Sequence, residues 1–230
     1  MIAITFALPT ESAELRGKLK SVREDSQIVF GKLGDAEVAV FHTGVGRQHC
    51  RRSLESFLEA VKPECLVSAG FAGSVNDNLQ VGDLIIAKNF SDPALLSHIA
   101  AERFRAAKLV TVETVIESAE QRAHVVQTHN ADAIDMETDV IAEMCAARTI
   151  PMLSLRVISD SPTAPFPVPA DVMFDVARQR TNFGRLIPYL LAHPAATVRL
   201  LRFASQINRI RANLADAIVR VVAAVSRELR

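Results

Sequence analysis

Short apolar runs alternate along this chain with longer stretches in which apolar residues recur every three or four positions. The first pattern is typical of buried β-strands, and the second is typical of helices that bury one face. Strands are predicted at residues 2–8, 28–33, 36–42, 65–68, 84–87, 109–116 and 152–158, and helices at 12–19, 48–61, 94–105, 138–148 and 198–225. This alternation predicts a single α/β domain whose mixed central β-sheet is flanked by helices.

The end of the chain departs from this alternation. We expect a domain at residues 1–182 and a C-terminal helical extension at residues 183–230. Within the extension, Leu200, Phe203 and Ile207 fall on one side of a helix that carries arginines near the edges of that side. Two interpretations stay open: the helix packs on its own domain or on a partner, or it lies at a membrane surface. No apolar stretch is long enough to span a bilayer.

Composition narrows the class of protein. Lysine plus arginine equals aspartate plus glutamate at 26 residues each, so no overall charge attracts nucleic acid. The three cysteines, Cys50, Cys65 and Cys145, lack the spacing of metal ligands and predict buried thiols in a reducing compartment. The apolar run at residues 1–8 is too short for a signal sequence or a membrane span. We therefore expect a cytoplasmic protein with no metal and no cofactor.

Two acidic residues occupy positions where chemistry is expected. Glu137 opens the predicted helix 138–148, and Asp160 closes the apolar strand that follows this helix. A strand, a helix and the next parallel strand would bring both carboxylates to one carboxyl-end crevice, where α/β sheets bind ligands. An acid at the end of a buried strand needs a partner or a ligand, although aspartate also serves in turns and helix caps. On this pattern alone, both the catalytic and the structural interpretation stay open.

Three more segments place polar groups where a strand ends. Glu11 lies in the first turn of the predicted helix that follows the first strand, where the helix dipole favours an acid. Residues 43–47 (Thr-Gly-Val-Gly-Arg) and 69–74 (Ala-Gly-Phe-Ala-Gly-Ser) are predicted to be glycine-bearing turns whose amides favour an anion or a polar oxygen. Neither segment matches the dinucleotide fingerprint or the P-loop, which disfavours those two classes of protein.

Six short segments of this chain occur in the same order as the motifs of a known family, which makes the resemblance specific. They are residues 7–11, 43–46, 68–73, 81–83, 135–137 and 156–160. In this order they resemble the nucleoside phosphorylase superfamily, nearest to its nucleosidase branch, over roughly residues 1–175. The tail is similar to that of the hopanoid-associated phosphorylase-like proteins, which are thought to remove adenine from an adenosylated lipid.

The resemblance implies cleavage of the N-ribosyl bond of a purine nucleoside, of the adenine type, by water. Asp160 would be the general acid that protonates the leaving base. Glu137 would bind the ribose hydroxyls, with Met136 packed against the sugar face, and Glu11 would activate the attacking water. No cofactor is implied beyond water, and we expect a homo-oligomer that acts on a small nucleoside.

The resemblance also implies a wall for the base. Val115 and Ile116 would lie beside the purine, and Phe71 would face the site from the glycine-bearing turn. The alternative is that these three side chains belong to the ordinary apolar core.

Other functions stay open on the sequence. In a phosphorolytic enzyme, phosphate would meet Arg47 and the amides of Gly44, Gly46 and Gly70. Removal of adenine from an adenosylated lipid such as adenosylhopane is a further alternative, in which the C-terminal helix would contact the inner membrane surface. A non-enzymatic nucleoside-binding module is the third, although it would have no need of three acids.

Overall fold

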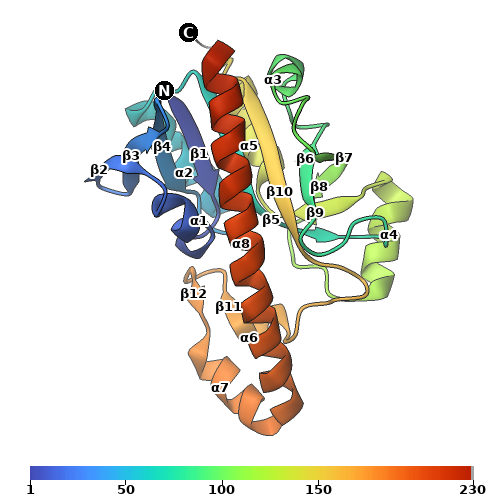
Figure 1. The fold of residues 1–230 in the computed structure, drawn as a ribbon. Helices are drawn as coiled ribbons and strands as arrows, with labels where there is room; N and C mark the ends of the chain where they lie inside the picture. Colours follow the sequence, from blue (N-terminus) through green and yellow to red (C-terminus); the bar gives the residue numbers. More distant parts are fainter. Residues whose placement is uncertain (229–230) are drawn as a thin grey trace.

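The computed structural model describes residues 1–228, which are built around one large twisted sheet (Figure 1). Its strands are β1 (Ile2–Phe6), β2 (Lys20–Asp25), β3 (Ile28–Leu33), β4 (Ala36–His42), β5 (Cys65–Ser74), β6 (Leu84–Ala87), β7 (Arg105–Ala107), β8 (Leu109–Thr111), β9 (Ala133–Asp135) and β10 (Met152–Asp160). They lie in the order β2-β3-β4-β1-β5-β10-β6-β7, and β8 pairs with β9 beside the end of β5. Strand β1 is parallel to β4 and β5, whereas β6 is antiparallel to β10, so the expected mixed sheet is confirmed.

Helices cover both faces of the sheet. They are α1 (Pro9–Arg16), α2 (Arg47–Ala60), α3 (Pro93–His98), α4 (Ala119–His129), α5 (Thr138–Ala146), α6 (Ala170–Met173), α7 (Phe183–Ala192) and α8 (Pro194–Glu228), with a small hairpin of β11 (Phe174–Asp175) and β12 (Arg180–Thr181) after α6. Because side chains of a strand alternate between faces, Ile2, Ile4 and Phe6 of β1 pack in one apolar cluster with α8, and Ala3 packs in another with α2 and α5.

Helix α8 has two halves with different surroundings. Its distal half buries eight apolar residues in the same cluster as β1, β5 and β10: Ile210, Leu214, Ala215, Ala217, Ile218, Val221, Val222 and Val225. Its first half projects beyond the sheet together with α6 and α7 (Figure 1), and Val198 and Leu201 are 51% and 68% exposed there. The distal half therefore packs on its own domain, whereas the first half exposes apolar side chains.

Some expected elements differ from the structure. Residues 69–74 are not a turn but the end of β5, because their backbone pairs with β10 and then with β9. The strand expected at 109–116 ends at Thr111, and the helix expected at 94–105 ends at His98, after which Arg105–Ala107 joins β6 as β7. The expected parallel unit around α5 is also wrong, since β9 is antiparallel to β5 whereas β10 is parallel to it.

The cysteines and the helices agree with two expectations. All three cysteines are buried with free thiols, and burial raises the pKa of Cys50, Cys65 and Cys145 to about 12. Across residues 1–228, no helix combines the length and the apolarity that crossing a bilayer requires.

Candidate active site

The carboxyl end of β5 brings two of the candidate acids together. Gly73 pairs with Ile134 of β9 on one side and with Asp160 of β10 on the other. The register of β10 shifts between Ile158 and Asp160, which is a bulge at Ser159 that re-aims the side chain after it. The absence of a side chain on Gly73 matters, because a Cβ atom there would lie 3.0 Å from Oδ2 of Asp160. Glu137 and Asp160 thus come close together because β9 and β10 both pair with the end of β5, not because β9, α5 and β10 form a parallel strand–helix–strand unit.

Glu11 reaches the same place from α1. Its Oε2 accepts a hydrogen bond from the backbone N–H of Leu8 at 2.9 Å, and its Oε1 accepts one from Phe71 at 3.3 Å. A Cβ atom on Gly70 would lie 3.4 Å from Oε1, so the glycine lets β5 pass close to the carboxyl group. Glu11 is 7% exposed, and this burial raises its pKa although the two backbone donors oppose the change.

Glu137 is held at the start of α5. Its Oε1 accepts a hydrogen bond from the backbone N–H of Gly46 at 2.7 Å, and Gly46 has the left-handed φ of 89° that favours glycine. Burial and the nearby charge of Asp135 raise the pKa of Glu137 to about 8. Both effects favour the neutral carboxylic acid over the carboxylate in the free protein.

Asp135, two residues before Glu137, forms an ion pair with Arg156 that the sequence did not predict. Arg156 donates to Oδ2 of Asp135 at 3.1 Å, to the hydroxyl of Thr138 at 2.6 Å and to that of Ser68 at 2.8 Å. Thr111 donates to the other carboxylate oxygen at 2.9 Å. The available signal was a lone arginine inside the apolar strand 152–158, which requires a buried anion as partner.

Asp160 is held from two sides. The hydroxyl of Ser159 donates to its Oδ1 at 2.8 Å, and the guanidinium of Arg122 donates to its Oδ2 at 2.5 Å. Both partners are buried, and Arg122 comes from α4, a helix that the sequence analysis did not propose.

One cavity of about 210 Å³ joins the three acids. Seven of the expected site residues line it: Glu11, Phe71, Val115, Ile116, Met136, Glu137 and Asp160. Leu8, Val45 and Phe166 add apolar wall that was not expected, and no lysine or arginine of residues 1–228 lines this cavity. The cavity therefore combines apolar walls with carboxyl groups.

The remaining expected residues lie around this cavity. Gly46 binds Glu137 through its N–H, and Gly70 lies behind Glu11. Gly44 lines a neighbouring pocket with His42 and His49. Arg47 is 46% exposed and pairs with Asp139 on α5, so its guanidinium does not line the cavity.

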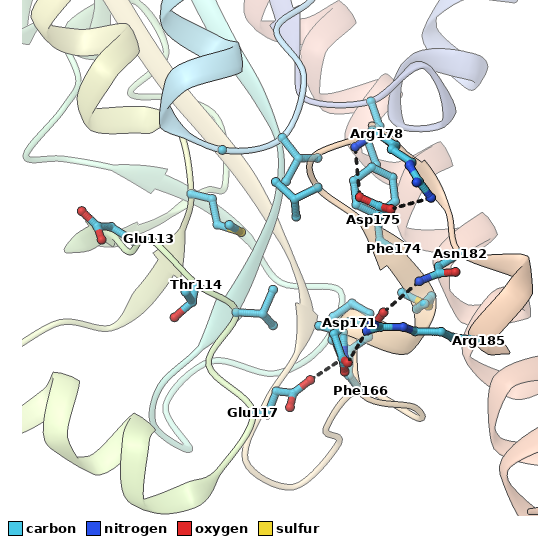
Figure 2. A pocket seen from close by; sticks show the side chains of 18 residues that line it. Glu113, Thr114, Glu117, Phe166, Asp171, Phe174, Asp175, Arg178, Asn182 and Arg185 are labelled. Carbon is cyan, nitrogen blue, oxygen red and sulfur yellow. Dashed lines mark hydrogen bonds and ion pairs between the residues drawn. The ribbon is translucent and has the colours of Figure 1, made fainter. Parts of the chain in front are cut away.

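A larger chamber of about 860 Å³ adjoins the cavity (Figure 2). The two share Leu8, Val45, Val115, Met136 and Phe166. Figure 2 shows ion pairs and hydrogen bonds at the far side of the chamber, where the side chains of Asp171, Asp175 and their partners gather. The chamber therefore has an apolar entrance from the cavity and a polar outer rim.

The hairpin of β11 and β12 closes one side of this chamber. Gln179, between the two strands, accepts from the N–H of Val45 at 2.7 Å and donates to its carbonyl at 2.9 Å. These paired bonds fix the hairpin to the loop that also carries Gly46.

Comparisons with known proteins show which sequences and folds this chain is similar to. The sequence model of the phosphorylase superfamily matches residues 1–98 and 88–192. The 5′-methylthioadenosine/S-adenosylhomocysteine nucleosidase of Staphylococcus epidermidis is 26% identical over 196 residues, which cover 70% of this chain and 86% of the relative. Among solved structures, the nucleosidase of the same name from Neisseria meningitidis, in complex with methylthio-immucillin-A, matches with a TM-score of 0.71 at 17% identity, over 96% of this chain and 97% of that one.

A second solved structure has another activity. Futalosine hydrolase of Helicobacter pylori matches with a TM-score of 0.66 at 17% identity, over 99% of this chain and 97% of that one. At these identities the structural matches establish a shared fold. Because the superfamily model matches well over half of the sequence, this chain belongs to the phosphorylase superfamily.

Proposed function

We propose that this protein is an enzyme that hydrolyses the N-ribosyl bond of a purine nucleoside, of the adenine type. The observation that carries the proposal is the meeting of Glu11, Glu137 and Asp160 in one apolar cavity, whose walls suit a flat base. Membership of the superfamily and the nucleosidase names of similar proteins support the same class of reaction.

The three acids divide the work of the reaction. Asp160 takes up a proton from solvent when the nucleoside binds. As the bond from C1′ to the base breaks, charge passes to the base, and Asp160 transfers or shares this proton at the purine N7. A water molecule attacks C1′ from the opposite face and gives its proton to Glu11. Glu137 accepts hydrogen bonds from the ribose hydroxyls, and Met136 packs against the sugar. The products are the free base and the free sugar.

Water fits this cavity better than phosphate does. A phosphate ion needs cations or free amides, but within residues 1–228 the cavity lining holds three candidate acids and no lysine or arginine. Arg47, the candidate phosphate ligand, is paired with Asp139 outside the cavity.

One experiment tests reaction type and enzyme class together. The full chain is incubated with adenosine, inosine, methylthioadenosine and adenosylhomocysteine, with and without phosphate, and base, free sugar and ribose 1-phosphate are measured. We expect base and free sugar at a rate that phosphate does not change. Ribose 1-phosphate as the main product would replace hydrolysis by phosphorolysis, and binding without any product would identify a nucleoside-binding module.

The large chamber favours a second candidate substrate, an adenosylated lipid such as adenosylhopane. A nucleoside whose sugar occupies the small cavity would direct a long substituent into the adjoining 860 Å³, past Val115 and Phe166. Such a substituent would gain about 25 cal/mol for each Å² of apolar surface that leaves water. The discriminating measurement is kcat/KM for adenosine against adenosine derivatives with apolar 5′-chains of increasing length. A constant or falling value with chain length would contradict this candidate.

The outer end of the molecule suits a membrane surface. Phe183, Ile187 and Leu191 follow one face of α7 with exposures of 63%, 54% and 78%, next to the exposed Val198 and Leu201 of α8. Residues 183–209 contain four arginines and no acidic residue, which favours anionic lipid.

Point substitutions test this surface, because truncation near residue 194 would remove core residues of α8. Leu191→Glu should reduce sedimentation with anionic vesicles and leave cleavage of soluble nucleosides unchanged. The matched control is Val22→Glu on the edge strand β2, where Val22 is 51% exposed and belongs to neither α7 nor α8. Equal vesicle binding by both variants and by the wild type would exclude the outer surface as the contact.

A further inference from the structure

Arg122 contacts Asp160 but has no role in the reaction steps proposed above. It is 3% exposed, it belongs to the first turn of α4, and it lines neither the cavity nor the chamber. Its guanidinium donates to Oδ2 of Asp160 at 2.5 Å, to the backbone oxygen of Ile116 at 3.3 Å and to the backbone oxygen of Ser74.

These three acceptors belong to three different parts of the site. Asp160 ends β10, Ser74 ends β5, and Ile116 lies in the wall beside the base position. A planar guanidinium has five N–H donors in a fixed fork, so it holds several acceptors in one geometry, as a lysine ammonium does not. Since Ser159 occupies Oδ1, the carboxylate of Asp160 is restrained at both oxygens.

Stability alone gives a weak reason for this arrangement. Removing two charges from water costs about as much free energy as their attraction in the interior returns, so a buried ion pair adds little net stability. The placement of the guanidinium against both the carboxylate and the cavity wall gives a stronger reason. It fixes the distance between the group that meets the leaving base and the surface on which that base rests.

We propose that Arg122 is a positioning residue, which sets the orientation of the Asp160 carboxylate relative to the base wall at Ile116. The proposal rests on the proposed function, in which Asp160 acts on the leaving base. A misplacement of a reacting group by about 1 Å can lower a rate about a hundredfold, so loss of the fork should appear mainly in kcat.

The test measures kcat and KM of Arg122→Ala and Arg122→Lys with the nucleoside that the wild type cleaves best. We expect kcat of Arg122→Ala to fall about a hundredfold with a much smaller change in KM. Guanidinium ion at a concentration below that which unfolds the protein should restore part of the loss. The kcat of Arg122→Lys should lie between that of the wild type and that of Arg122→Ala, because a lysine ammonium keeps the charge but not the planar set of N–H donors.

The matched control is Arg51→Ala. Arg51 is an exposed arginine of α2 that pairs with Glu143 at 2.7 Å, so its loss should change neither kcat nor the response to guanidinium. A second measurement adds Arg122→Ala to Asp160→Asn. If Arg122 acts through Asp160, the double variant should have the kcat of Asp160→Asn alone, since neighbours that act as a unit are not additive.

The outcomes separate the two proposals. If Arg122→Ala fails to fold, the kcat values of Arg122→Lys and of the double variant still test the positioning role. The double variant removes both members of the ion pair and therefore leaves no unpaired charge. Wild-type kcat in a folded Arg122→Ala, or losses that multiply in the double variant, would overturn the positioning role while the nucleosidase function stands. A wild type that releases no base from any nucleoside would overturn both.

Discussion

Replacing Glu137 by glutamine should flatten the pH dependence of the stability of the free protein. Burial and the charge of Asp135 raise the pKa of this carboxyl from 4.5 to about 8 in the folded protein. Between these two pH values the folded chain keeps the proton that the unfolded chain has released. The free energy of unfolding therefore falls as pH rises through this window, and the loss is nearly complete at pH 8.

The magnitude follows from the size of the change. Raising a carboxyl pKa from 4.5 to about 8 corresponds to a destabilisation on the order of 4 kcal/mol at the upper end of the window. Glutamine keeps the oxygen that accepts from Gly46 but has no proton to lose. The variant should therefore unfold at a higher urea concentration than the wild type at pH 8, and at about the same concentration at pH 5.

Urea denaturation from pH 5 to pH 8 measures this difference. Glu11, whose pKa is also raised, contributes to the slope of both proteins, so only the difference between the two slopes belongs to Glu137. Glu59→Gln, at an exposed glutamate of α2, is the control and should follow the wild type. Parallel curves for Glu137→Gln and the wild type would refute the assignment of a neutral acid at this position.

Three substitutions test the chemistry directly. Asp160→Asn should lower kcat on the order of a hundredfold or more, because an amide cannot supply the proton, while circular dichroism shows an intact fold; near-normal turnover would contradict the general-acid role. Glu11→Gln should stop hydrolysis without weakening the binding of free adenine, because the amide positions water but cannot accept its proton; retained release of free sugar would remove Glu11 from the reaction. Gly73→Ala should lower kcat, because the new Cβ would lie 3.0 Å from Oδ2 of Asp160, and a crystal structure with an unmoved carboxylate would contradict that cause.

The sequence predicted which acids meet better than it predicted how they meet. Position at the start of a helix and at the end of a strand indicated Glu137 and Asp160, the family resemblance added Glu11, and each of these side chains lines the cavity. The expected parallel unit failed because pairing partners are set across the sheet, where Gly73 contacts both β9 and β10. Residue type and local hydrophobic period do not determine which strands pair, and they do not predict the bulge at Ser159 either.

The two buried arginines show a second limit. Arg156 lies in a strand that was predicted correctly, but no feature of the sequence identifies its partner Asp135, which lies in the segment 135–137 of the family resemblance. Arg122 stands in a stretch for which no element was proposed, although Ser118 and Gln121 form a capping box there. The apolar strand around Arg156 indicates that this arginine is buried, but it does not identify the partner. No such context surrounds Arg122, and since most arginines are solvated, only the packed fold shows that it contacts a carboxylate.

The burial of the distal half of α8 has a consequence for the half that projects. A helix is slow to nucleate, but once a first turn exists each further residue adds its hydrogen bond at little entropic cost. In α8 the core around Leu214 and Val221 fixes the nucleus, so residues 194–209 form by elongation from it. At 1.5 Å per residue they extend the helix by about 24 Å. Exposed side chains of that segment, such as Val198 and Leu201, can therefore be replaced by other helix-favouring residues without disturbing the residues that carry the chemistry.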